Sequence, residues 1–497
     1  MKNEPILNTN SWQANLKLWM TYFITLNIVF LYYQTTFFIG NHDWDWIKGT
    51  TQVLTLSTGM FEGRYAKFIL NILLYGGQIL PFINTITAFG LLALGMVMFC
   101  RYWHIEKTSA QIIIGLYGSL SPFILGWLYF PINILGNFMA VPLVAVGLIA
   151  GEKHRNLIAT LCFIIALGVY PSVAELMIVG YMIQCILANK INLRVGLNIL
   201  GTMILFKGIL IVLSHYGIIY SDYYNLKMQS ISEIGENIFQ IIKACLRQLG
   251  VSIPFYPLSI KGCGAIMIIT SIVSSVYTAK SKGKILGLWG CAVAATILSY
   301  TLTPMHEEVF AAPRVNFYGL NFLYVGSLAI LLSGKKVSRN FGMILGIIGI
   351  ILSVQQDFYA QKVWHFGRTG EQYMVDRITH TILDQTQDDK KRVPIIAGEI
   401  SLRPKYYIET YDIAGPYVLS RSFVVRHIPS GMYNFYTSKP LFANQSVITE
   451  MSPELYRYLS ENKQLWPSAQ SLYTDEKYII LMLTAEGQKM IRAQLPK

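Results

Sequence analysis

The chain has 497 residues, of which 53% are hydrophobic and only 13% charged, and its mean hydropathy is +0.43. A soluble domain carries about 25% charged residues, so this composition excludes an ordinary soluble protein and indicates a polytopic α-helical membrane protein. The net charge of +13 is not gathered into a basic stripe with interleaved aromatic residues, so we expect no nucleic-acid partner.

The charges divide the chain into two parts. Residues 1–354 hold 12 of the 27 acidic and 23 of the 40 basic residues, and residues 355–497 hold the rest in a pattern like that of a soluble domain. We therefore predict a transmembrane domain over 1–354 and a small C-terminal extracytoplasmic α/β domain over 355–497. In the second domain, strands are expected in "RVPIIAGEI", "YVLSRSFVVRHI" and "KYIILML", with helices near 370–386 and 453–462.

A membrane span needs about 20 mostly apolar residues, and on this criterion the sequence predicts about eleven spans. They lie near residues 17–39, 82–100, 109–129, 132–150, 156–170, 172–188, 195–215, 258–279, 285–303, 316–333 and 340–354. Five short loops are basic, namely 101–107, 151–156, 189–194, 280–284 and 334–340. With a cytoplasmic N-terminus, all five fall on the cytoplasmic side, as the positive-inside rule requires. We therefore expect the chain to lie among membrane lipids, with its C-terminal domain on the outer side.

The first outer loop, residues 40–81, is both apolar and acidic. It opens with "GNHDWDWIKG" and continues with "GMFEGRYAKF", which is too apolar for a solvated connector and too interrupted for a second span. We expect one or two helices in the headgroup region, where tryptophan and tyrosine are favoured. Residues 216–257 form a second outer excursion, which is expected to be helical in its later half.

Asp43 and Asp45 are the candidate catalytic residues. They flank Trp44, so in an extended stretch both side chains point to one face, whereas in a helical turn they diverge. Either could be the general base that takes a proton from an acceptor hydroxyl as it attacks an activated sugar carbon. A carboxylate beside an oxocarbenium-like transition state would also stabilise its developing positive charge.

Further polar residues on the same side are candidates for binding substrate or phosphate. They are Glu62, Arg64 and Lys67 in the first loop, and His306, Glu307, Glu308 and Arg314 in "TPMHEEVFAAPR". Arg64 and Arg314 could hold a phosphate leaving group through paired hydrogen bonds. A divalent cation, Mg or Mn, could lie between Asp45 and Glu307 or Glu308, although nothing in the spacing requires one. The six cysteines include no C-x-x-C pair and indicate no zinc site.

Two ionisable residues are predicted inside neighbouring antiparallel spans, where each costs about 2.5–3.5 kcal/mol. Glu175 and Lys207 lie about 13 and about 12 residues from the cytoplasmic ends of their spans, which places them at similar depth. We expect them to form an ion pair or to face a common water-filled cavity. A purely structural pair, and a Lys207 that faces a lipid-linked phosphate, both remain open.

Several of these pieces resemble one family. The stretch "NHDWDW…GMFEGRYAKFILNILLYGGQILPFIN", with Gly63–Arg64 and Leu80–Pro81, the later "RYW", and "GVYPSVAE" at 168–175 are similar to the bacterial GtrII-type glucosyltransferases. These are O-antigen-modifying members of the GT-C class of polytopic glycosyltransferases. The resemblance is residue-specific mainly over 40–103, and Trp44 separates two acids that are often adjacent in the family.

The resemblance implies a reaction and a fold. Such enzymes move glucose from a polyprenyl-phosphate donor to a lipid-linked polysaccharide on the periplasmic face, inverting the anomeric centre, with a first-loop Asp as base. Carried onto this chain, Asp43 or Asp45 would be the base and Arg64 a phosphate or loop-organising contact. The alternatives are a lipid-linked sugar flippase or transporter, or an O-antigen polymerase. A transporter would favour repeated halves and broken helices near the midplane, and the sequence shows neither.

Overall fold

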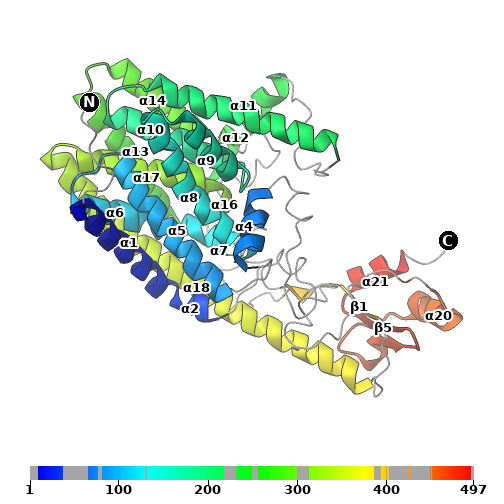
Figure 1. Ribbon diagram of the computed structural model, residues 1–497. Helices are drawn as coiled ribbons and strands as arrows, with labels where there is room; N and C mark the ends of the chain where they lie inside the picture. The colour runs from blue at the N-terminus through cyan, green and yellow to red at the C-terminus, as the bar shows by residue number, and fades with distance from the viewer. Residues whose placement is uncertain are drawn as a thin grey trace. The chain divides into compact units, whose positions relative to one another are not determined.

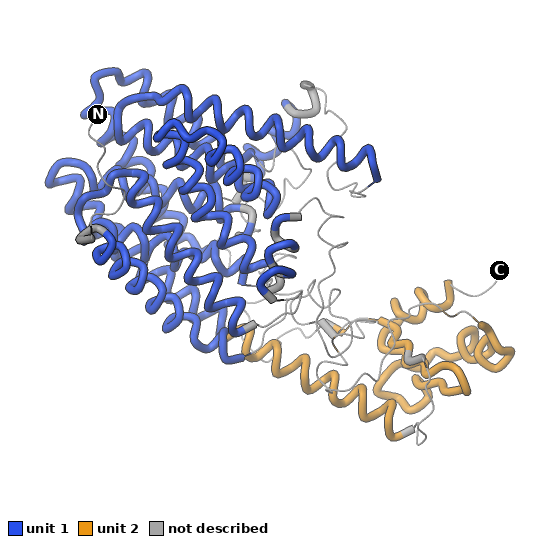
Figure 2. The backbone as a smooth tube through the Cα atoms, in the orientation of Figure 1, with its two compact units in different colours: residues 1–37, 55–361 blue, residues 38–54, 362–497 orange. Residues whose placement is uncertain are grey.

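The structure is a computed structural model of the whole chain, and two compact units can be distinguished in it (Figure 1; Figure 2). It describes residues 9–36, 65–75, 81–128, 131–217, 231–248, 256–298, 313–385, 393–398, 400–401, 424–425, 432, 448 and 450–493. Unit 1 is helical and extends to Gln361, and unit 2 contains the C-terminal residues from Lys362 onward.

Unit 1 is a bundle of helices. In chain order they are α1 (Thr9–Val29), α2 (Leu31–Thr35), α4 (Tyr65–Tyr75), α5 (Pro81–Tyr102), α6 (Thr108–Ser119), η2 (Pro122–Ile124), α7 (Leu125–Leu128), α8 (Pro131–Glu152), α9 (Asn156–Leu167), α10 (Val173–Leu187), α11 (Leu193–His215), α12 (Ile231–Gln248), α13 (Leu258–Thr278), α14 (Lys282–Ala295), α16 (Pro313–Asn316), η5 (Phe317–Asn321), α17 (Phe322–Ser333) and α18 (Lys336–Gln385). Helix α5 packs on α8, α8 on α9, and α10 and α13 both pack on α17.

The bundle has a buried centre and an apolar surface. Every residue of α17 from Phe322 to Leu332 is buried, whereas α11, α13 and α18 expose large apolar side chains such as Leu193, Val273 and Ile344. Apolar surface of this extent is unfavourable in water and suits contact with lipid tails.

Six described helices are long and apolar enough to cross a membrane. They are Phe82–Tyr102, Thr108–Leu128, Asn133–Glu152, Leu193–His215, Leu258–Thr278 and Lys336–Asp384. Three further apolar helices, Asn156–Leu167, Val173–Leu187 and Phe317–Ser333, are shorter. The expected count of about eleven spans therefore remains a prediction.

Three of the basic turns close in the same way. His104, His154 and Asn189 have positive φ angles of 52°, 60° and 50°. In each turn the next residue donates its N–H to a carbonyl five residues back, for example Ile105 to Cys100 at 3.0 Å. This is the left-handed C-cap that ends many helices, with histidine or asparagine where glycine is commonest.

Side-chain contacts gather the basic turns at one end of unit 1. Lys284 Nζ donates to the Asn189 carbonyl at 3.5 Å, and Asn198 Nδ2 donates to the Asn156 carbonyl at 3.4 Å. The ammonium of Lys335 lies 5.8 Å from the centre of the Tyr277 ring, just before the 280–284 turn. Helices α8, α10 and α13 all end at this side, so their first turns lie at the opposite end.

Several helices are interrupted at that opposite end. Helix α6 stops because Pro122 holds the preceding Ser121 in an extended conformation, with ψ of 139°. Pro171 lies between α9 and α10, at the predicted boundary between the spans 156–170 and 172–188. Residues 317–321 form the π-helical turn η5 before α17. Single π-turns inside helices occur frequently at functional sites.

Helix α18 runs without a break from Lys336 to Gln385, through the region where the sequence indicated a span ending at 354 and a separate helix near 370–386. Both stretches are helical as predicted, but they belong to one continuous helix, because no proline interrupts the stretch and polar residues support helix as well as apolar ones do. Gln361 of α18 is hydrogen-bonded to both sides of the α1–α2 junction. Its Nε2 donates to the Val29 carbonyl at 2.8 Å, and its Oε1 accepts from the Tyr33 N–H at 3.1 Å.

Unit 2 contains a three-stranded sheet in the order β1-β5-β4. Its elements, in addition to the end of α18, are β1 (Val393–Ala397), β2 (Ile400–Ser401), β3 (Val424–Val425), α20 (Pro453–Glu461), η7 (Ala469–Ser471), β4 (Leu472–Thr474), β5 (Tyr478–Met482) and α21 (Ala485–Arg492). Strands β1 and β5 are parallel, with Ile395 paired to Ile480, and β4 is antiparallel to β5. Strands β2 and β3 form a separate antiparallel pair. The predicted strands at "RVPIIAGEI" and "KYIILML" and the helix near 453–462 are confirmed.

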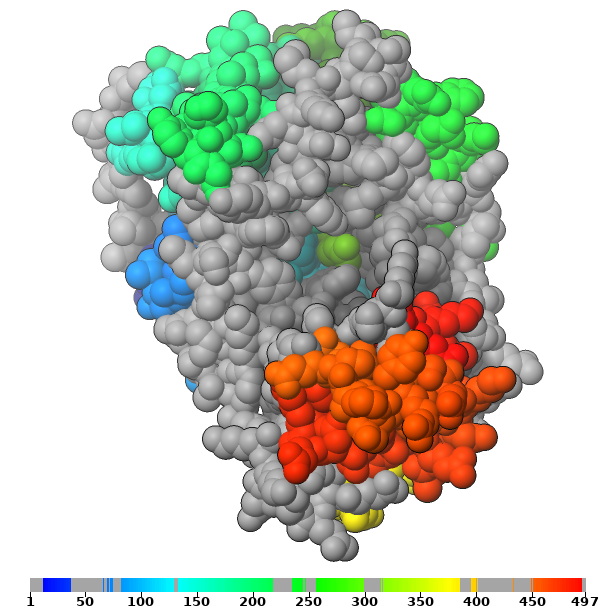
Figure 3. All heavy atoms as spheres, turned by 90° about the vertical axis from the view of Figure 1, so that its right-hand side faces the viewer, coloured from blue at the N-terminus to red at the C-terminus, as the bar shows by residue number. Residues whose placement is uncertain are grey.

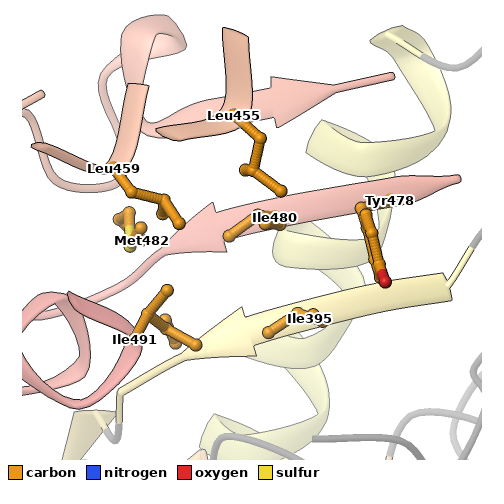
Figure 4. Packing of buried hydrophobic residues seen from close by; sticks show 8 residues of the cluster. Ile395, Leu455, Leu459, Tyr478, Ile480, Met482 and Ile491 are labelled. Carbon is orange, nitrogen blue, oxygen red and sulfur yellow. The ribbon is translucent and has the colours of Figure 1, made fainter. Parts of the chain in front are cut away.

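The core of unit 2 lies between the sheet and the helices α20 and α21 (Figure 4). Its labelled members are Ile395, Leu455, Leu459, Tyr478, Ile480, Met482 and Ile491 (Figure 4). Alternation along β5 places Tyr478, Ile480 and Met482 on the same face, where they meet Leu455 and Leu459 of α20.

We expect Gln361→Leu to lower the free energy of unfolding of the full chain by about 1–3 kcal/mol, because it leaves the Tyr33 N–H and the Val29 carbonyl without their partner. The measurement is thermal unfolding in detergent micelles. Asp357→Asn, one turn away, is the matched control and should not destabilise the protein, because neither carboxylate oxygen of Asp357 is hydrogen-bonded to any described residue.

Replacing Ile480, which is fully buried in the centre of the unit 2 sheet, by alanine should destabilise unit 2 by about 2–5 kcal/mol. Limited proteolysis of the full chain should then cleave the C-terminal region faster than in wild type. Met490→Ala on the exposed face of α21 (46% exposed) is the control and should leave the rate unchanged. Equal cleavage rates for Ile480→Ala and wild type would contradict the assignment of this core.

Candidate functional site

A row of aromatic side chains lies at the end of unit 1 away from the basic turns. Phe123 lies 5.1 Å from Tyr256 and 6.2 Å from Tyr324 between ring centres. Four residues further along, Trp127 lies 5.0 Å from Tyr170 and 6.0 Å from Tyr318. We call the six residues Phe123, Trp127, Tyr170, Tyr256, Tyr318 and Tyr324 the aromatic belt. The short segment η2–α7 joins its two halves.

A carboxylate lies at one end of the aromatic belt. Glu175, in the first turn of α10, is 0% exposed. Its Oε2 lies so near Gly319 of η5 that a Cβ at that glycine would be 2.5 Å from it, and 2.9 Å from Thr296 Cα. The π-helical turn and a residue without a side chain thus admit the carboxylate between α10, α14 and η5. Gly319 follows Tyr318 directly in the chain, so the carboxylate lies against the residue next to Tyr318.

The tyrosine beside that glycine is held by hydrogen bonds. Tyr318 Oη donates to the Asn137 carbonyl of α8 at 2.9 Å and is fully buried. Asn321 Nδ2, at the end of η5, donates to the Gly118 carbonyl at 3.4 Å, close to where α6 stops. The two interrupted helices therefore contact each other, and the polar groups released by their breaks are used between them.

A cation lies at the other end of the belt. Lys261, in the first turn of α13, is 8% exposed, and its ammonium lies 5.3 Å from the centre of the Tyr256 ring. The hydroxyls of Tyr256 and Tyr324 are hydrogen-bonded to each other. A cation over an aromatic face is stabilised by the ring quadrupole, more strongly where water is excluded.

Figure 3 faces this end of the molecule. Near the centre of this view, a few atoms in the colours of the α7–α8 and α16–α17 segments are visible (Figure 3).

Most of the candidate residues named from sequence lie outside the described residues. These are Asp43, Asp45, Glu62, Arg64, His306, Glu307 and Glu308. Lys67 belongs to helix α4, but its side chain is not among those described. Arg314 lies in the short helix α16, directly before η5, and is partly buried. Arg314 and Glu175 therefore lie on elements that meet at η5.

The helix of the first loop is attached to the same end of unit 1. Helix α4 follows the segment that contains Arg64, and its Ala66 donates its N–H to the Gly168 carbonyl at 3.1 Å. Gly168 is two residues from Tyr170 of the aromatic belt. The expectation of a helix within residues 40–81 is thus confirmed for Tyr65–Tyr75.

The expected ion pair between Glu175 and Lys207 is wrong. Glu175 is fully buried in α10, whereas Lys207 lies on the exposed face of α11, and no ion pair joins them among the described residues. The buried face of α11 is formed by Thr202, Phe206 and Leu210. Lys207 follows Phe206 directly, and one residue turns a helix by about 100°, away from that face.

Sequence reasoning missed three buried charged residues among those described, namely Lys261, Asp357 and Glu371. Lys261 lies inside the predicted span 258–279 and is only three residues after its start, a place where lysine usually reaches outward to water. Asp357, fully buried on α18, was assigned to the soluble domain that was expected to begin at 355. The signal for Asp357 was the apolar periodicity of α18, which continues through the buried residues Ala360, Val363 and Trp364.

Metal binding finds no support in the described part of the chain. There, no three or more His, Cys, Asp or Glu side chains come together. The carboxylates proposed as ligands of a divalent cation, Asp45 with Glu307 or Glu308, lie outside the described residues, so that site remains a prediction.

Compared with protein families, with curated proteins and with solved structures, the chain matches none of them.

We expect Gly319→Ala to lower the free energy of unfolding by about 1–3 kcal/mol, because the new methyl group must displace the Glu175 carboxylate or the backbone at Thr296. Thermal unfolding in micelles measures the effect. Gly262→Ala in α13 is the matched control, since its added Cβ meets nothing within 4 Å, and it should be neutral or slightly stabilising. Similar unfolding temperatures for the two variants would refute the close approach.

Proposed function

We propose that this chain is a membrane glycosyltransferase that moves glucose or another hexose from a polyprenyl-phosphate donor to a lipid-linked polysaccharide on the periplasmic face. The observation that carries the proposal is the aromatic belt with the buried Glu175 carboxylate at one end. The belt lies at the end of unit 1 opposite the basic turns, which the positive-inside rule assigns to the cytoplasm. Aromatic rings near a carboxylate suit a sugar ring that gains positive charge during transfer.

The first loop supplies the proposed base. Helix α4 begins beside Gly168, and the acids Asp43 and Asp45 precede it in sequence by about 20 residues. A linker of that length can reach the belt. In the proposed step, Asp43 or Asp45 takes the proton of the acceptor hydroxyl. At the same time, the oxygen of that hydroxyl bonds to the anomeric carbon of the donor sugar from the face opposite the leaving group. The bond from that carbon to the phosphate oxygen breaks, so the sugar is inverted and polyprenyl phosphate leaves.

Other residues have supporting roles in this proposal. Glu175 stabilises the positive charge that develops on the sugar ring, and Arg64 and Arg314 offer paired hydrogen bonds to the departing phosphate. Glu62, Lys67, His306, Glu307 and Glu308 complete the polar surroundings of the substrates. Unit 2 is proposed to help hold the acceptor glycan.

A lipid-linked sugar flippase is the second candidate, and the interrupted helices favour it. The contact between the end of α6 and η5, through Asn321 and Gly118, places two helix breaks together. Transporters often build their substrate site from such breaks. A flippase would move the donor across the bilayer without breaking the sugar–phosphate bond, so the two candidates differ in product.

The test is transfer of radiolabelled glucose from polyprenyl-phosphate glucose to lipid-linked polysaccharide in membranes that contain the full chain. One of Asp43→Asn and Asp45→Asn should reduce the rate at least about 100-fold, as loss of a general base does. Glu175→Gln should reduce it at least about tenfold, because a neutral amide cannot stabilise positive charge. Glu236→Gln on the exposed face of α12 is the control and should be fully active.

Each result has a definite meaning. Loss of activity in one aspartate variant, at expression and stability equal to wild type, identifies the base. Wild type that transfers no glucose, but moves the labelled donor across the vesicle membrane, would refute the transferase and favour the flippase. Full activity in both aspartate variants would refute the proposed base.

A further inference from the structure

Helix α12 presents a stripe of exposed apolar side chains. Its Ile241 is fully buried, so one side of the helix is packed. Next to that side, four large apolar residues are 37–65% exposed, namely Ile238, Phe239, Ile242 and Leu246. Each residue turns a helix by about 100°, which places these four within about 100° of arc. We call them the α12 stripe.

Charged residues prevent α12 from crossing a membrane. The helix contains Glu233, Glu236, Lys243 and Arg247, and each charge would be costly at the centre of a bilayer. Among the described helices, α12 is not one of those that are long and apolar enough to span. Glu236 and Lys243 are exposed and lie beside the α12 stripe. An apolar stripe bordered by charges is typical of a helix that lies along a membrane surface.

The helices before and after α12 meet it at the end of unit 1 away from the basic turns. Helix α11 begins directly after the basic turn 189–194, so its last residue, His215, lies at the opposite end. Helix α13 ends at the basic turn 280–284, so Leu258 lies at that opposite end as well. Seven residues separate Gln248 of α12 from Tyr256, which keeps the end of α12 within about 28 Å of this place.

The neighbouring surfaces favour lipid as the partner of the α12 stripe. Ile211 and Val212 near the end of α11 are 50% and 53% exposed, and Leu258 at the start of α13 is 45% exposed. These side chains belong to helices that can span the membrane, so their exposed faces suit lipid tails. The lipid-facing surface thus reaches both helix ends to which α12 is joined. A stripe of large apolar side chains is unfavourable in water, whereas lipid tails accept it and headgroups accept a flanking lysine.

We propose that α12 lies in the headgroup region of the outer leaflet and inserts the α12 stripe among phospholipid tails, with Lys243 reaching the lipid phosphates. The contact anchors the second outer excursion, residues 216–257, to the membrane surface. It requires no catalytic step, so it stands whether or not the chain transfers glucose.

Photochemical cross-linking identifies what touches the α12 stripe. Full-length protein with benzoylphenylalanine in place of Ile242 is irradiated in phospholipid nanodiscs, and the α12 peptides are analysed by mass spectrometry. A lipid adduct should form at least about fivefold more often at position 242 than at Gln240, because two residues turn the helix by about 200°. Val273, which is 63% exposed on the spanning helix α13, is the positive control and should also form a lipid adduct.

The other outcomes of this experiment overturn the proposal. Cross-linking of position 242 to a second copy of the chain would assign the α12 stripe to a protein interface. Cross-linking to another segment of the same chain would assign it to the interior of the protein. Lipid adducts at position 273 but none at 242, or equal yields at 242 and 240, would exclude an α12 stripe that is inserted in lipid.

A second measurement tests the depth of α12 in the unmodified chain. In nanodiscs, Lys243 should react with a water-soluble acylating reagent at least about tenfold faster than Lys207, because a headgroup-level amine meets water whereas lipid tails shield a lysine on the exposed face of a span. Lys207 is the matched control, since it lies about eight residues, or about 12 Å, before the end of α11. Equal reaction rates would place α12 as deep as Lys207 and overturn its position among the headgroups.

Discussion

The close approach of the Glu175 carboxylate to the backbone of η5 is the constraint on which the functional end of unit 1 depends. A fully buried carboxylate is expensive in an apolar bundle, so the helices around it must provide both space and polar groups. Space comes from Gly319, which has no side chain, and from the extra residue in the π-helical turn. The same turn aims Tyr318 at α8, where its hydroxyl donates to Asn137. The position of Glu175, the shape of η5 and the direction of the Tyr318 side chain therefore depend on one another.

From that turn the aromatic belt extends across four separated segments of the chain. Tyr170 comes from the α9–α10 connection, Trp127 and Phe123 from η2–α7, Tyr256 from the residues before α13, and Tyr324 from α17. The belt can form because α6 stops at Ser119, so that Phe123 of η2 meets Tyr256 and Tyr324, whereas Trp127 of α7 meets Tyr170 and Tyr318. A continuous helix through residues 108–128 would distribute Phe123 and Trp127 along a straight axis. The helix break at Pro122 thus allows the aromatic contacts at this end of the bundle.

The two ends of the aromatic belt differ in chemistry, because one lies near an acidic side chain and the other near a basic one. An acid adjoins Tyr318 and an ammonium lies over Tyr256, with rings between them. In a site of low dielectric, fixed charges act strongly on a substrate whose own charge is separated, as in a sugar joined to a phosphate. Helix α4 brings the first loop to the same place through Ala66 and Gly168. This arrangement is the basis of the transferase proposed above.

Composition and local pattern were sufficient for much of the fold. The apolar helices, the basic turns and the strands β1 and β5 follow from hydropathy, charge and alternation, because these signals depend on residues adjacent in sequence. The depth of Glu175 near the start of its helix also followed from counting residues. By contrast, composition does not predict the continuity of α18. Its residues change from apolar to polar along the chain, but the helix continues without a break.

The functional end could not be assigned from sequence alone. Lys207 and Lys261 both lie within apolar helices, and only packing decides that Lys207 faces outward whereas Lys261 lies on the buried stripe of α13. The belt joins residues that are far apart in sequence, and no local pattern shows that Phe123 will meet Tyr256 or that Glu175 will lie against Gly319. The sequence by itself determined a helical membrane protein with a small C-terminal sheet, because burial in lipid selects composition. Only the tertiary structure decided which charges lie inside, because that depends on the rotation of each helix about its axis.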